Sequence, residues 1–101
     1  MVTEIAYLAI DPGNADAFEE AVRKAIPVFA GASGCRAMRL ERVHEDEAQY
    51  RLVVEWDSVE HHMVTFRQTP AFEEWRALAG PFFVAPPRVE HWRRVPGFSA
   101  E

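Results

Sequence analysis

Residues 49–57 carry the pattern that most restricts what this chain can fold into, because apolar and polar side chains alternate along them. One side of this segment consists of Tyr50, Leu52, Val54 and Trp56. A period of two residues predicts a β-strand with one buried face. The preceding residues 35–43 predict another strand, and the polar residues 44–47 form a link short enough for a hairpin. The sequence therefore predicts an antiparallel pair of strands in the middle of the chain.

A strand and an amphipathic helix precede this hairpin. Residues 2–10 are rich in β-branched and aromatic side chains and end at the turn-forming residues 11–14. Apolar side chains then recur at helical spacing, at Phe18, Val22, Ala25 and Phe29. Because Pro27 has no backbone N–H, we expect this helix to bend or to end in its last turn.

Two helical segments and a final strand follow the hairpin. Ser58 is a typical helix N-cap, and Thr69 followed by proline predicts the start of a second helix. Residues 88–95 alternate again and predict a fourth strand. His91 and Trp92 are neighbours on it, so one must face the helices and the other must face away. The sequence leaves open which of them does so.

The order of these elements predicts an α+β fold with the ferredoxin-like split βαβ topology. We expect one domain over residues 1–101, with a four-stranded antiparallel sheet and helices on one face. The strands contain apolar residues on both faces, so the second face needs a cover. We therefore expect a homodimer in which a second copy provides that cover.

Charge and composition restrict the partners. The formal net charge is -5, so we expect no binding to a nucleic-acid backbone. No apolar run is long enough to cross a membrane and no signal peptide is evident, so we expect no membrane association and a cytoplasmic protein. The single cysteine, Cys35, is expected to be a small buried residue. The four histidines lack metal-site spacing and no phosphate-binding glycine loop is present, so we expect no metal and no cofactor.

Several short motifs resemble the antibiotic biosynthesis monooxygenase family, and the likeness covers nearly the whole chain. They are Trp56-Asp57-Ser58, Phe66-Arg67, Pro70-Ala71-Phe72, Trp75-Arg76, Gly80-Pro81-Phe82-Phe83 and Pro86-Pro87. The resemblance implies a dimeric α/β barrel whose subunits each keep a pocket between sheet and helices. Some members oxidise anthrone-type aromatics to quinones with molecular oxygen and no metal, flavin or haem. Others degrade haem, isomerise lactones or oxidise quinols, and the Asn of the haem-degrading branch is absent from the first strand here.

Cofactor-free oxygenation of an aromatic compound requires an apolar cavity, a base and the exclusion of water. We interpret His62 as the catalytic base, because imidazole titrates near neutral pH and His62 lies four residues before Phe66 on a helical segment. The residues expected to bind a small apolar aromatic substrate are Tyr7, Trp56, Phe66, Arg67, Trp75, Phe83 and His91.

Two functions remain open on these grounds. The first is a cofactor-independent monooxygenase that oxidises an anthrone- or quinol-type substrate. The second is a non-catalytic dimer that binds a small ligand or acts in assembly, in which His62 has only a structural role. An open cavity surrounded by His62, Trp75 and Phe83 favours the enzyme, whereas a filled core favours the second function.

Overall fold

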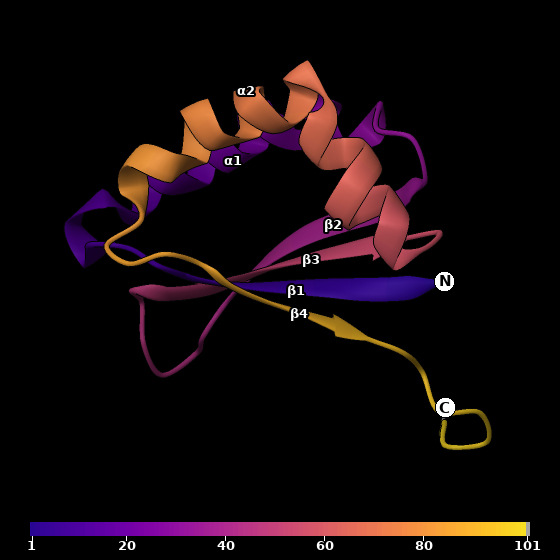
Figure 1. The fold of residues 1–101 in the computed structure, drawn as a ribbon. Coiled ribbons are helices and arrows are strands. Elements are labelled where there is room, and N and C mark those ends of the chain that lie inside the picture. The colour runs from indigo at the N-terminus through magenta and orange to yellow at the C-terminus, as the bar shows by residue number, and fades with distance from the viewer. Residues whose placement is uncertain (101) are drawn as a thin grey trace.

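The fold is a twisted sheet of four strands with two principal helices on one of its faces (Figure 1). The computed structural model describes residues 1–100. The strands are β1 (Val2–Ala9), β2 (Cys35–Arg42), β3 (Gln49–Trp56) and β4 (Arg88–Trp92), and the helices are α1 (Ala15–Ala30) and α2 (Pro70–Ala79). The strands lie in the order β2-β3-β1-β4, and every neighbouring pair is antiparallel. The predicted α+β class and ferredoxin-like topology are confirmed.

Short helical turns connect these elements. A 3₁₀ turn (Pro12–Asn14) precedes α1, a π-helical turn (His61–Thr65) and a 3₁₀ turn (Phe66–Gln68) lead into α2, and a 3₁₀ turn (Gly80–Phe82) follows it. Both predicted N-caps form: Ser58 Oγ accepts from the His61 N–H at 3.2 Å, and Thr69 Oγ1 accepts from the Phe72 N–H at 3.3 Å.

Among the described helices, none has both the length and the apolar character that a membrane crossing requires.

The predicted end of the fourth strand differs from the structure. The fourth strand ends at Trp92 rather than at residue 95, because Trp92 already lies opposite Thr3 and β1 begins at Val2. Residues beyond Trp92 therefore have almost no strand left to pair with. The first helix ends at Ala30, within one turn after Pro27, and Gly31 is its C-cap. A proline in the last turn removes only one backbone hydrogen bond, so the helix continues past it to this point.

The hydrophobic core lies between the sheet and α1. Alternate residues of each strand point toward the helices, and the largest fully buried side chains in this core are Trp56, Phe18, Phe29, Leu8, Leu52 and Val54. The opposite face of the sheet is mixed rather than apolar. Ile5 and Val53 are buried on it, but Glu41 bridges Arg39 and Arg51 beside them.

Gly34 fixes the segment that follows β3 against the start of β2. Its φ of 79° lies in the left-handed region, and a Cβ at this position would come within 2.4 Å of the His61 ring. The Gly34 carbonyl also accepts a hydrogen bond from the Asp57 N–H at 2.8 Å. Glycine adopts this φ without strain and, because it has no Cβ, leaves room for the His61 ring. The hydrogen bond to Asp57 and the close approach of His61 hold the π-helical turn near the start of β2.

Candidate active site

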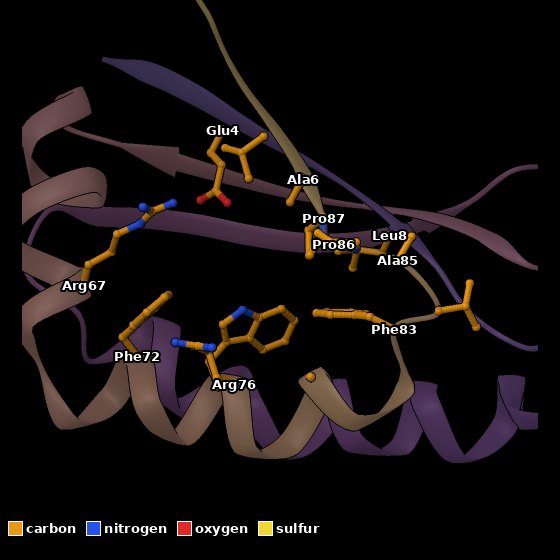
Figure 2. A pocket seen from close by; sticks show the side chains of 14 residues that line it. Glu4, Ala6, Leu8, Arg67, Phe72, Arg76, Phe83, Ala85, Pro86 and Pro87 are labelled. Atoms are coloured by element: carbon orange, nitrogen blue, oxygen red, sulfur yellow. The ribbon is translucent and has the colours of Figure 1, made fainter.

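A cavity of about 610 Å³ opens between the sheet, α2 and the segment that leads into β4 (Figure 2). This volume is in the range that holds a drug-sized molecule. Its walls combine aromatic rings, proline rings and small side chains with three charged groups. The lining residues are Glu4, Ala6, Leu8, Arg67, Phe72, Trp75, Arg76, Gly80, Phe83, Val84, Ala85, Pro86, Pro87 and Val89. The cavity is therefore mostly apolar, with few polar groups to orient a ligand.

Glu4 is the buried carboxyl group of this cavity. It lies on β1 in the row of side chains that faces the helices, and only 5% of its surface is exposed. The indole N–H of Trp56 donates to its Oε1 at 2.9 Å. Burial raises the pKa of Glu4 to about 7, although Trp56 and the charge of Arg67 act in the opposite direction. Figure 2 shows the Arg67 guanidinium extending toward the Glu4 carboxylate.

His62 lies behind Glu4 and is almost fully buried. Its Nε2 is 3.3 Å from Glu4 Oε1, slightly longer than an ordinary hydrogen bond. The imidazole stacks on Trp56, with ring centroids 5.4 Å apart and an interplanar angle of 19°. Burial is the main cause that lowers the pKa of His62 to about 4, and the charges of His91 and Arg67 act in the same direction. The ring is therefore neutral at pH 7.

His91 continues this line of side chains to the edge of the sheet. It lies directly opposite Glu4 in the β1–β4 ladder and points toward the helices, whereas Trp92 points away and is 55% exposed. His91 Nε2 is 2.9 Å from His62 Nδ1. Partial burial lowers the pKa of His91, with a smaller contribution from Arg67. The structure thus settles the orientation that the sequence left open.

Two arginines lie beside the aromatic wall of the cavity. The guanidinium carbons of Arg67 and Arg76 are 5.9 Å and 5.8 Å from the centre of the Phe72 ring. Neither arginine has a carboxylate within ion-pair distance in the part of the chain that the structure describes. Positive charge next to flat apolar surface suits an aromatic ligand that carries a phenolate or another anionic group.

The predicted site residues fall into three groups. Arg67, Trp75 and Phe83 line the cavity. His62, His91 and Trp56 lie around Glu4 without lining the cavity, and Phe66 is buried behind them against the Trp56 and Phe29 rings. Tyr7 lies on the opposite face of the sheet, where its hydroxyl donates to Glu90 at 3.1 Å. The structure does not bring Tyr7 to the cavity.

Glu4 was not predicted from the sequence, although it is the most deeply buried charged group of the cavity. One signal was present in the sequence. Along β1, Glu4 lies an even number of residues from the apolar residues Val2, Ala6 and Leu8, so its side chain is on the same face of the strand as theirs. Arg76 and Phe72 were also not selected. Within residues 1–100, no group of three or more His, Cys, Asp or Glu side chains is arranged to hold a metal ion.

Comparisons with known proteins agree with this geometry. A family model described as antibiotic biosynthesis monooxygenase matches residues 1–78. The uncharacterized protein YczJ of Bacillus subtilis is 38% identical over 95 residues, which cover 94% of this chain and 100% of that protein. A solved structure from Bordetella bronchiseptica that carries the same family name is 44% identical, covers 93% of this chain and 96% of its own, and has a TM-score of 0.90.

A more distant structural relative carries a more specific description. A variant of SnoaB, described as a cofactor-independent oxygenase from Streptomyces nogalater, superimposes with a TM-score of 0.80 and covers 98% of this chain and 97% of its own. The two sequences are 14% identical, so this likeness shows the shared fold alone.

Proposed function

Because this chain belongs to the antibiotic biosynthesis monooxygenase family, we propose that it oxidises a small aromatic substrate of the anthrone or quinol type with molecular oxygen and without a bound cofactor. Family membership supports a monooxygenase-type function in general. The observation that carries the more specific proposal is the buried carboxyl group of Glu4 at the inner end of an aromatic cavity. A base set in an apolar cavity is what deprotonation of a carbon or phenol requires.

Glu4 is the proposed base at the substrate, with His62 behind it. The sequence-based hypothesis assigned this role to His62, but Glu4 stands between His62 and the cavity. A carboxyl group with a pKa of about 7 is half ionised at neutral pH and accepts a proton far more readily than an exposed glutamate. His62 and Trp56 then orient the Glu4 carboxylate and limit its movement.

The proposed reaction begins when the Glu4 carboxylate removes a proton from an activated C–H group, such as the methylene of an anthrone. The carbanion gives one electron to O₂, and the two resulting radicals combine to form a carbon–oxygen bond. The peroxide takes the proton back from Glu4, and loss of water then leaves a carbonyl group. The methylene carbon is oxidised, and O₂ is reduced to the carbonyl oxygen and one water. No external reductant is needed.

The remaining cavity residues hold the substrate in this proposal. Phe72, Trp75 and Phe83 provide flat apolar surfaces for an aromatic ring system. Arg67 and Arg76 are placed to stabilise the negative charge that develops on the phenolic or enolate oxygen after deprotonation. Charge stabilisation of this kind matters most where water is excluded.

Oxygen consumption by the metal-stripped protein with a panel of anthrones and hydroquinones tests the proposal. We expect uptake that falls by about 10²- to 10⁴-fold in Glu4→Gln, because a positioned base contributes rate of this order. The control is Glu74→Gln, which removes an exposed acid of α2 outside the cavity and should retain full uptake. Ligand binding without uptake above buffer would contradict the oxygenase and favour the non-catalytic ligand-binding dimer.

The homodimer remains part of the proposal. Support comes from the apolar side chains exposed on or just after the edge strand β4: Trp92 is 55% exposed, Val95 61% and Phe98 84%. A second copy that covers the outer face of the sheet would bury them. Light scattering at micromolar concentration tests this, and we expect the mass of a dimer. A stable monomer would contradict it.

A further inference from the structure

We propose that Glu4, His62 and His91 form a proton relay that connects the carboxyl group in the cavity with solvent at the edge of the sheet. The two nitrogens of the His62 ring face different partners, with Nε2 toward Glu4 at 3.3 Å and Nδ1 toward His91 at 2.9 Å. An imidazole placed in this way can accept a proton on one nitrogen and release another from the other nitrogen. The relay concerns the free protein and needs no substrate to operate.

The protonation states on the relay are fixed by what each atom can donate or accept. An ionised Glu4 only accepts, so in this state of the relay His62 carries its proton on Nε2, the nitrogen nearer to Glu4. A neutral His62 then accepts on Nδ1, which requires a proton on His91 Nε2. In this state His91 Nδ1 carries no proton.

Protonation of Glu4 through the relay reverses every one of these assignments. A proton from solvent binds His91 Nδ1, the His91 Nε2 proton moves to His62 Nδ1, and the His62 Nε2 proton moves to Glu4 Oε1. One proton enters and Glu4 gains one proton, so the balance closes. Both imidazoles are neutral before and after the transfer, and each has changed tautomer.

The outer end of the relay is open to water. His91 lies on β4, an edge strand, and is only half-buried. Its ring is on the helix side of β4, away from the outer face that the proposed second copy covers, and His91 does not line the cavity that contains Glu4. The relay therefore joins the cavity to a separate solvent-exposed surface.

The charges around the relay disfavour an imidazole that stays doubly protonated, so a proton that reaches either ring is passed on. Arg67, from the 3₁₀ turn before α2, lowers the pKa values of both imidazoles as well as that of Glu4. The thiol of Cys35, at the start of β2, is the other titratable group that senses the charge of Glu4, and it is neutral at pH 7. Burial and the charge of Arg67 both disfavour the charged form of His62 and of His91.

The relay has a use in the proposed function, and only this step rests on that function. A substrate bound over Glu4 covers the direct route from the carboxyl group to water in the cavity. Near its pKa, a large share of Glu4 is protonated when the substrate binds and is unable to act as a base. The relay allows such a Glu4 to lose its proton through His62 and His91 while the substrate stays in place.

Nitrogen-15 NMR of histidine side chains in the free protein tests the relay. Across pH 5 to 9 we expect His62 and His91 to switch tautomer together, with one midpoint equal to the pH at which the Glu4 carboxyl carbon titrates. His44 and His61 belong to neither end of the relay and serve as internal controls. Either imidazole keeping one tautomer through the Glu4 titration, or becoming an imidazolium there, would overturn the proposal.

The Glu4→Gln variant makes the test specific. Glutamine keeps the shape of the side chain but does not titrate, so His62 and His91 should each keep one tautomer over the same pH range. A switch that persists in Glu4→Gln at the wild-type midpoint would show a different proton source and contradict the relay. Because no substrate is present, absence of oxygen uptake would count against the proposed enzyme and leave the NMR result unaffected.

Discussion

Two glutamates on opposite faces of the same sheet show how surroundings decide the chemistry of a carboxyl group. Glu4 on β1 faces the helices, has no hydrogen-bonded arginine and is buried, and its pKa is raised to about 7. Glu41 on β2 faces away from the helices and accepts hydrogen bonds from Arg39 and Arg51, which lower its pKa. The first is poised to exchange a proton, and the second is held as an anion.

The difference arises from the kind of partner and not only from depth. A buried carboxylate with a bonded arginine would stay ionised, because the ion pair offsets desolvation. The Glu4 partners are instead a neutral indole and a neutral imidazole, and Arg67 acts on it only through its charge. This arrangement costs stability whenever Glu4 ionises, which is typical of functional rather than structural carboxyl groups.

The largest effect that tests this comparison is expected in the pH dependence of stability in Glu4→Gln. The folded-state pKa of Glu4 is raised, so its contribution to stability is complete below pH 4.5 and is lost as the pH rises to about 7. A shift of this size corresponds to about 3 kcal/mol. Chemical unfolding from pH 4 to 8 should show the variant gaining about 3 kcal/mol relative to wild type. A constant difference across this range would mean that Glu4 is not perturbed.

His62→Gln should change the pH dependence in the opposite direction. The pKa of His62 is lowered from 6.5 to about 4, so the stability that its neutral form provides is present above pH 6.5 and is lost as the pH falls to about 4. In the variant, we expect the rise of the unfolding free energy with pH to be smaller by about 2 kcal/mol. The effect is smaller than for Glu4 because His91 can accept a proton from a charged His62. The same unfolding series measures it, and an unchanged slope would contradict a neutral His62.

Arg67→Met should produce a smaller change that affects three groups at once. Arg67 lowers the pKa values of Glu4, His62 and His91, so all three should rise in the variant. NMR titration of the carboxyl and imidazole groups measures the direction. Binding of an anionic aromatic ligand should weaken about fivefold, because one charge-assisted contact contributes roughly 1 kcal/mol net. Arg23→Met, on the exposed side of α1, is the control, and equal changes in both variants would show a general effect of charge.

The fold was predictable from the sequence because its signals are local. Alternation along residues 49–57 and the caps Ser58 and Thr69 each specify one element through neighbouring residues. The error at the end of β4 had a tertiary cause. The length of β4 depends on where its partner β1 begins, and that register is not visible in residues 88–95 themselves.

The candidate site was only partly predictable, because it depends on contacts between distant segments. Arg67, Trp75 and Phe83 were selected for chemical type and do line the cavity. The contact between Glu4 and His91 follows from the β1–β4 register, which joins residues from opposite ends of the chain. The sequence shows that Glu4 lies on the same face of β1 as Val2, Ala6 and Leu8. It does not show that the helices cover this face, which is what buries the carboxyl group.

The smallest expected effect is that of Glu41→Gln, and it sharpens the comparison because the chemical change is the same as in Glu4→Gln. In a single copy of the chain Glu41 contributes through exposed ion pairs with Arg39 and Arg51, which water and salt screen, so at concentrations below those of dimer formation we expect a loss of at most about 1 kcal/mol at pH 7. Its folded-state pKa is lowered, so this contribution is present above pH 4.5 and is lost as the pH falls below it. Unfolding at low and high salt should show the loss shrinking at high salt, in contrast to the salt-insensitive effect at Glu4. A loss at Glu41 as large as the effect at Glu4, measured at concentrations where the protein is dimeric, would support the proposed homodimer, because a second copy packed against the outer face of the sheet would shield these ion pairs from water.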